Sequence, residues 1–202
     1  MISKVFFVVL ILSVLIYVPQ ALGQYVDEPA IVHKDELGMN FALAMSGLGI
    51  GGFYRKAIGG YSYLGVNANF FIMRDDNEYE YYNAIGIPVK ANDINRLFFI
   101  PVNLEFKKRL FAQDIEDNFR PHFILQGGII YGMNFPKLEG LKNESGFSYN
   151  FVIGVGADVT NRDKYFISIR PQYRIIYFNN EIAQKKNHSN FEIKIELGGR
   201  LF

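Results

Sequence analysis

Apolar and polar residues alternate along most of the chain, and the clearest example runs from Arg96 to Leu110. Apolar side chains stand there at every second position, namely Phe98, Ile100, Val102, Leu104 and Phe106. Polar residues, among them Asn103, Glu105 and Lys107, fill positions of the opposite parity. A period of two over five repeats predicts an extended strand with one apolar face and one polar face.

The same alternation recurs through the rest of the chain after residue 38. It covers residues 39–54, 61–74, 120–133, 147–160, 165–179 and 191–202. In the first of these segments the large apolar residues change from odd to even positions at Gly47-Leu48-Gly49. Such a change of phase requires either a turn or a β-bulge. A turn gives eight strands in all and a bulge gives seven, and the pattern alone leaves both open.

The amino terminus has the pattern of a targeting segment. Lys4 precedes an almost entirely apolar run, Val5 to Val18, and Ala21-Leu22-Gly23 supplies small residues for cleavage. We therefore predict a signal peptide over residues 1–23, cut between Gly23 and Gln24. The apolar run is shorter than the roughly 20 residues of a transmembrane helix. Residues 24–37 are polar and predict a short periplasmic lead-in to one domain, residues 38–202.

Composition narrows the class of protein. The formal net charge of +1 gives no electrostatic basis for binding nucleic acid. The absence of cysteine excludes a disulfide scaffold and a cysteine-ligated metal. The chain has 13 Tyr, 19 Phe and 19 Gly, and this combination is typical of β proteins. With no helical period anywhere after the signal segment, we predict an all-β fold, a closed antiparallel up-and-down barrel.

The composition of the two strand faces indicates which of them points outward. A soluble barrel has an apolar interior, whereas a membrane barrel has an apolar exterior. The polar faces here are rich in Gly and Asn with scattered charges of both signs, which favours a tightly filled interior. Tyr61, Tyr149, Tyr165 and Tyr177 lie near strand ends, where interfacial aromatic girdles occur. We therefore predict a transmembrane β-barrel whose stripe from Phe98 to Phe106 faces lipid.

The connections between the predicted strands fit this interpretation. With eight strands starting at the periplasm, residues 75–95, 134–146 and 180–189 lie outside the cell, and residues 56–60, 111–119 and 160–164 lie inside. Long outer loops and short inner turns are the asymmetry that bacterial outer-membrane barrels show, and their even strand number favours eight.

Five features of the chain occur together: the signal peptide, the glycine-rich first hairpin, RLFFIPVNLEFKKRLF, the segment Asp117 to Pro121 and a last strand that ends at Phe202. In these features the chain resembles the small outer-membrane β-barrel, porin-like proteins of Gram-negative bacteria. The resemblance implies integral outer-membrane localisation, and contact with outer-membrane lipids, lipopolysaccharide and the barrel-assembly machinery, the last through the strand ending at Phe202. In that family the final Phe shares a face with apolar residues. Phe202 shares parity with Arg200 instead, unless a bulge at Gly198-Gly199 restores the phase.

The polar faces carry charges that would lie inside the barrel. We predict a lumen network of Glu105, Lys107, Asp158, Arg170, Arg174, Glu192, Lys194, Glu196 and Arg200. Unpaired buried charges are costly, so these residues should form ion pairs across an interior that eight strands leave just wide enough for side chains. We predict a monomer without cofactor or enzymatic activity that reinforces the membrane or makes contacts through its surface loops. The alternatives are a narrow channel for small solutes and a lipid-A-modifying enzyme.

Other motifs have weaker chemical interpretations. Gly47-x-Gly49-x-x-Gly52 matches a dinucleotide-binding spacing, but no helix follows it. His188-Ser189 are adjacent residues, which point to opposite faces of a strand and suit a catalytic pair poorly. The acidic residues of the loop from Asp75 to Glu80 do not match a calcium-binding loop. Pro101 and Pro171 remove backbone donors within strands, and we predict a bulge at Pro101.

Overall fold

A computed structural model describes residues 34–75, 79–91, 94–111, 118–137, 141–161 and 164–201. The predicted signal peptide, its cleavage point between Gly23 and Gln24, most of the predicted lead-in, and Phe202 lie outside the described residues. No helix within the described ranges is long and apolar enough to cross a membrane.

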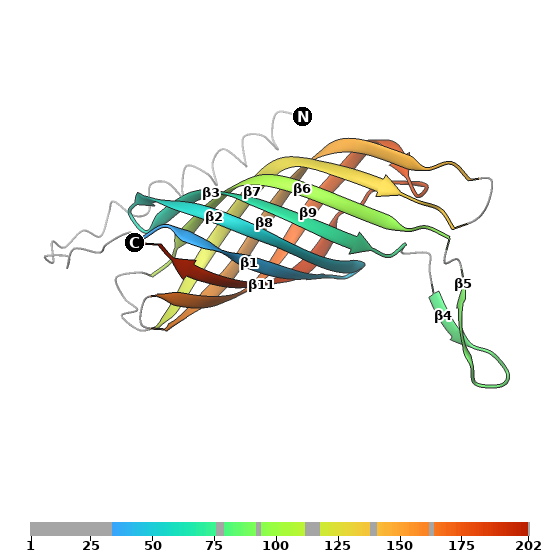
Figure 1. The fold of residues 1–202 in the computed structure, drawn as a ribbon, viewed down its shortest axis with the longest axis horizontal. Coiled ribbons are helices and arrows are strands. Elements are labelled where there is room, and N and C mark those ends of the chain that lie inside the picture. Colours follow the sequence, from blue (N-terminus) through green and yellow to red (C-terminus); the bar gives the residue numbers. More distant parts are fainter. Residues whose placement is uncertain are drawn as a thin grey trace, which may run out of the picture. The chain divides into compact units, whose positions relative to one another are not determined.

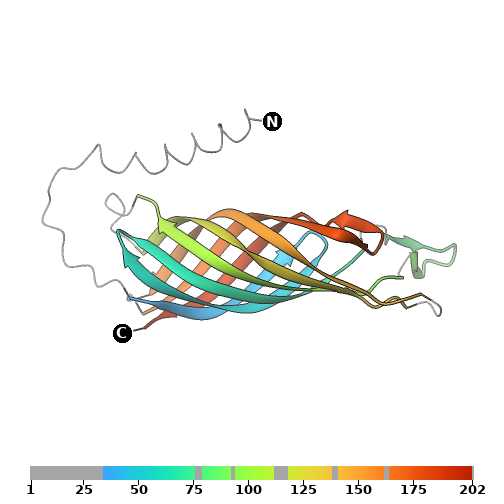
Figure 2. The ribbon, with the colours of Figure 1, turned by 90° about the horizontal axis from the view of Figure 1, so that it is seen from above.

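Eight long strands form one closed antiparallel barrel, as predicted (Figures 1 and 2). The strands are β1 (Glu36–Ala44), β2 (Gly47–Gly59), β3 (Ser62–Met73), β6 (Leu97–Arg109), β7 (Phe119–Asn134), β8 (Glu144–Asn161), β9 (Tyr165–Ile182) and β11 (Asn190–Arg200). Each pairs with the next strand along the chain, and β1 pairs with β11 to close the barrel. Every backbone ladder is therefore internal, which a membrane-spanning sheet requires.

The change of phase in the first predicted segment is a turn, which gives eight strands and excludes the bulge. Ala44 pairs with Gly47, so that only Met45 and Ser46 connect β1 to β2. The glycines that mark the change of phase lie at the start of β2, just after the turn. The barrel begins at Glu36, so the last two residues of the predicted lead-in belong to the first strand.

The two ends of the barrel differ in their connections. We call the end near Glu36 and Arg200, which pair with each other, the termini end, and the opposite end the loop end. The connection from β3 to β6 at the loop end contains a hairpin of β4 (Tyr79–Tyr82) and β5 (Pro88–Ala91). This hairpin lies beyond the loop end of the barrel (Figures 1 and 2). A further short strand, β10 (Lys185–Asn187), pairs with the end of β9.

The prediction of a bulge at Pro101 is wrong. Pro101 pairs with Ile130 of β7 in an unbroken register. On the other side, the ladder from β6 to β3 omits two pairs near Pro101 and resumes in the same register at Phe71–Phe99. The ladder from β9 to β8 is interrupted in the same way near Pro171. The missing donor is thus accommodated by a local gap in one ladder, without an extra residue.

No bulge occurs at Gly198-Gly199 either. The pairings of β11 with β1 and with β9 keep one register through this pair. Arg200 therefore lies on the same face as Glu196 and Lys194, as the simple alternation implies. The parity of the last described strand is unchanged up to its end.

Alternation along the strands gives the barrel an apolar outside and a largely polar inside. In β6, Leu104 is 66% exposed, Val102 47% and Ile100 36%, while Phe98 and Phe106 are half-buried against outward-facing neighbours. Glu105, between Leu104 and Phe106, is 1% exposed. Tyr149, Tyr165 and Tyr177 are exposed on the outer face, and Tyr61 is half-buried.

Candidate functional site

The middle of the lumen is filled by charged and amide side chains. Eight of the nine residues of the predicted lumen network are at most 1% exposed: Glu105, Lys107, Asp158, Arg170, Arg174, Glu192, Lys194 and Glu196. Arg200 is partly exposed at the termini end. These residues come from β6, β8, β9 and β11, so the network joins distant strands across the interior.

Arg55 is the central cation of this network, although it was not in the predicted set. Its guanidinium donates to Glu105 of β6, to Glu196 of β11 over 2.6 Å and to Glu36 of β1 over 3.2 Å. It also stacks over the ring of Phe53, with 3.9 Å between its Cζ atom and the ring centroid. Gly65 lies opposite Arg55 in β3, and a Cβ atom there would come within 2.9 Å of the Arg55 Cγ atom. The glycine therefore leaves the space through which this side chain crosses the lumen.

A second group lies nearer the termini end. The Lys107 ammonium donates to Asp158 over 2.7 Å and to Glu36 over 3.1 Å. His122 is fully buried beside them, with its Nδ1 atom 3.3 Å from a carboxylate oxygen of Asp158. Glu36 thus connects Lys107 to Arg55 and joins the two groups into one network.

The third group lies toward the loop end. Arg174 donates to Glu192 over 2.8 Å and to the amide oxygen of Asn150 over 2.9 Å. Asn150 donates in turn to Asn103, which donates to Gln126. Gln126 then donates to Glu105, a partner of Arg55. Amide side chains therefore connect the charged groups along the wall of β6, β7 and β8.

The charges of the central lumen balance. Five fully buried cations (Arg55, Lys107, Arg170, Arg174 and Lys194) face five carboxylates (Glu36, Glu105, Asp158, Glu192 and Glu196). Charged groups can be buried away from water only when they are paired and hydrogen-bonded. Equal numbers of buried cations and carboxylates are therefore expected in a closed lumen. Each cation also occupies volume through its long stem. The arrangement fills and cross-links the lumen.

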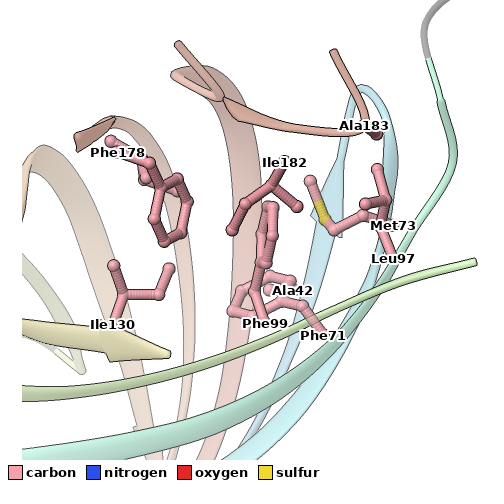
Figure 3. Packing of buried hydrophobic residues seen from close by; sticks show 10 residues of the cluster. Ala42, Phe71, Met73, Leu97, Phe99, Ile130, Phe178, Ile182 and Ala183 are labelled. Carbon is pink, nitrogen blue, oxygen red and sulfur yellow. The ribbon is translucent and has the colours of Figure 1, made fainter. Parts of the chain in front are cut away.

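An apolar cluster fills the lumen at the loop end, a layer that the sequence analysis did not anticipate. Its buried members are Ala42, Phe71, Met73, Leu97, Phe99, Ile130, Ile176, Phe178, Ile182 and Ala183. They point toward one another inside the ring of strands, with 5.7 Å between the ring centroids of Phe99 and Phe178 (Figure 3). Arg174 lies over the ring of Phe71 at 5.1 Å and marks where the polar layer meets the apolar layer.

The sequence carried a signal for this cluster. Adjacent residues in a strand point to opposite faces, so an apolar pair places one side chain in lipid and the other in the lumen. Such pairs occur at Phe70-Phe71, Phe98-Phe99, Ile129-Ile130 and Ile175-Ile176. All four lie in the half of their strand nearer the loop end.

The hairpin between β9 and β11 covers the apolar cluster. Ala183 and Gln184 form its tip and both have positive φ angles, 51° and 63°. Two-residue hairpin turns favour this conformation, although Asn-Gly adopts it at lower cost. The Ala183 amide donates to Glu144 over 2.7 Å, and Glu144 also accepts from Asn134. The hairpin tip is therefore fastened to the loop end of β8, the strand that pairs with β9.

The residues that suggested catalysis or metal binding have structural partners. The His188 ring packs edge-on against Phe99 and Phe178, and its Nε2 atom lies 3.1 Å from the carbonyl oxygen of Ile182. The Ser189 hydroxyl accepts from the amide of Ile176. Asp75 is buried and accepts from Asn95. Within the described part of the chain, no group of three or more His, Cys, Asp or Glu residues could hold a metal ion.

Comparison with known proteins identifies the fold. No protein-family model matches the chain, and no curated protein matches it in sequence. Neisserial surface protein A is similar in structure, with a TM-score of 0.53 and 10% identity over 83% of this chain and 94% of that one. A major outer membrane protein from Thermus thermophilus gives a TM-score of 0.53, with 10% identity over 83% of this chain and 98% of that one. The N-terminal β-barrel domain of Pseudomonas aeruginosa OprF gives a TM-score of 0.51, with 11% identity over 84% of this chain and 98% of that one.

The class of protein follows from the fold and the surface together. The chain has the fold of small outer-membrane β-barrels. Its own outer face is apolar along every barrel strand, and its charges are inside, which is the arrangement of a barrel surrounded by lipid. The chain is an integral outer-membrane β-barrel protein.

Proposed function

We propose that the chain is a non-conducting outer-membrane barrel that acts through contacts made at its loop end. The hairpin of β4 and β5 is the observation that carries this proposal. Its described side chains include four apolar residues that face solvent: Tyr81, Tyr82, Ile85 and Ile87, of which Ile85 is 82% exposed and Tyr82 73%. Large apolar side chains gathered on a surface favour a role in binding.

The tip of this hairpin is held in one conformation. The side-chain oxygen of Asn83 accepts from the amides of Ile85 and Ile87 over 3.0 and 2.9 Å. The backbone of Asn83 also exchanges bonds with Ile87 and Gly86, and Gly86 supplies the positive φ angle of 75° that the turn needs. A fixed tip loses little conformational entropy when it binds a partner.

The filled lumen supports the same proposal. Polar and apolar layers succeed one another inside the barrel, and both consist of fully buried side chains. A barrel filled in this way holds the ends of its loops in fixed positions. By the length of its connections the loop end faces the cell exterior. Lipopolysaccharide and surface partners are the contacts we propose, for a monomer without catalytic activity that the assembly machinery inserts through its last strand.

Cells that display the chain on their outer membrane provide the test. We expect the triple variant Tyr82→Ser/Ile85→Ser/Ile87→Ser to lose the autoaggregation and surface adhesion that the wild-type chain confers, while its amount in the outer membrane is unchanged. Leu141→Ser removes a 54% exposed apolar residue from another loop-end connection and serves as the matched control.

Sensitivity to detergent, measured in the same cells, distinguishes the second candidate function. Membrane reinforcement needs the barrel but not the hairpin. Full adhesion by the triple variant, together with detergent sensitivity on deletion of the whole chain, would overturn the contact proposal in favour of reinforcement.

A further inference from the structure

One place on the outer face of the barrel is hollow. A groove of about 480 Å³ opens on the wall formed by β7, β8 and β9. Its lining includes Pro121, His122, Gly156, Ala157, Ile169 and Pro171. Elsewhere the outward positions carry mainly Leu, Ile, Val, Phe and Tyr, but here small or cyclic residues are neighbours: Pro121 pairs with Ala157, which pairs with Ile169.

The groove coincides with the gap in the ladder near Pro171. The pairings of β8 with β9 run from Gly154–Gln172 to Ala157–Ile169 and omit the two pairs between them. Pro171 has no amide hydrogen to donate across this gap. Gly156 lies so close to the lumen that a Cβ atom there would come within 3.0 Å of the His122 ring. The ring of His122, on the lumen side of the wall, therefore lies at the floor of the groove.

The gap near Pro101 shows that a broken ladder alone does not make a groove. Pro101 points into the lumen, and its outward neighbours are large. Phe70 and Ile100 cover the omitted pairs from outside, and the ring of Phe70 stacks on that of Phe98 at 5.8 Å. The hollow at Pro171 therefore depends on the small side chains around it.

The position of the groove within the membrane indicates its occupant. Tyr165, 60% exposed at the termini end of β9, belongs to the interfacial girdle, and the Lys164 ammonium lies 5.5 Å from its ring centroid. Ile169 of the groove is four residues further along the same strand, which is roughly 13 Å. A cation at the interface and an apolar hollow about that far inside it match the phosphate and one acyl chain of a phospholipid.

We propose that this groove binds one acyl chain of a phospholipid from the leaflet at the termini end, with the phosphate beside Lys164. The groove walls that would contact the acyl chain are apolar. Among the described residues that line the groove, His122 alone is titratable, and it belongs to the lumen and lies at the floor. The proposal rests on the position of the barrel in a membrane. It is independent of the contact role of the hairpin, so the two can fail separately.

Native mass spectrometry of the chain extracted from vesicles of phosphatidylethanolamine and phosphatidylglycerol tests the groove. We expect the wild-type chain to retain one phospholipid. Ala157→Leu should lower that retention about tenfold, because the added carbons occupy the volume of the acyl chain. Ala68→Leu enlarges an outward-facing alanine on β3, away from the groove, and should retain lipid like the wild type. Heat-modifiable gel migration checks that each variant is folded, and Ala157→Val serves if Ala157→Leu does not fold.

Two results would overturn the proposal. Equal retention by the wild-type chain, Ala157→Leu and Ala68→Leu would mean that lipid binds the barrel wall without preference for the groove. A dimer that carries no lipid and is lost in Ala157→Leu would mean that a second copy of the chain covers the groove. Lys164→Gln tests the proposed position of the phosphate. We expect this variant to retain less phosphatidylglycerol than the wild type.

Discussion

The polar centre of the lumen and the apolar cluster at its loop end fill the same barrel by different physical means. In the centre, Arg55 and its three carboxylate partners hold four strands together, and each partner is costly to lose because the remaining charge would be buried alone. At the loop end, Phe99 and Phe178 fill space through dispersion and need no particular partner. The comparison indicates that a single substitution in the polar centre should destabilise the barrel strongly, whereas the apolar cluster at the loop end should tolerate replacement by other apolar residues.

The largest expected effect comes from breaking the charge balance of the centre. Glu196 accepts from Arg55 over 2.6 Å and lies 2.8 Å from Arg170, so Glu196→Gln leaves two buried guanidinium groups with less negative charge than they need. We expect a loss of about 3–5 kcal/mol in the free energy of unfolding, measured by urea titration in lipid vesicles. Glu181→Gln, at an exposed carboxylate, should change it by less than about 0.5 kcal/mol. Equal effects of the two variants would show that the central charges do not depend on one another.

A conservative change in the apolar cluster should cost less. Phe99→Leu keeps an apolar side chain of similar size among Phe178, Ile130 and Leu97. We expect a loss of about 1 kcal/mol in the same titration, since apolar exchanges of similar volume are generally tolerated. A loss as large as that of Glu196→Gln would refute the contrast between the two layers.

The smallest effect should come from the fastening of the hairpin above the cluster. Glu144→Gln keeps an acceptor for the Ala183 amide but removes the charge that strengthens the bond. We expect a loss of about 0.5–1 kcal/mol in the free energy of unfolding. Hydrogen exchange should become faster at Ala183 and stay unchanged in β7. Protection at Ala183 identical to the wild type would mean that packing alone holds the hairpin.

The polar centre and the apolar cluster also differ in how much of each could be predicted from the sequence. Alternation located the barrel strands and the polar positions that carry charges such as Glu105 and Glu196. It left seven or eight strands open, and the composition of the two faces was needed to decide which face points outward. Glu36 was not predicted because it precedes the first clear alternation. Arg55 was not predicted because the alternating segment was taken to end at residue 54, whereas β2 continues to Gly59. Both are central to the network, and only long-range register brings them beside Glu105 and Lys107.

The apolar cluster was not predicted because a membrane-barrel interpretation treats the inward face as polar throughout. Phe98 was predicted to face lipid, and no prediction was made for Phe99, whose ring points into the lumen. Pro101 and Pro171 each leave a gap in the ladder with only one of the two neighbouring strands. Which ladder is interrupted depends on the pairing partners of each proline, and the local sequence does not reveal those partners.

The closed lumen is the central claim, and conductance in a planar lipid bilayer tests it most directly. Purified, refolded wild-type chain should insert without steady unitary currents, while a general porin added to the same bilayer conducts. The buried ion pairs of the centre and the apolar cluster above them leave ions no favourable path. Steady unitary currents from the wild-type chain alone would contradict this account.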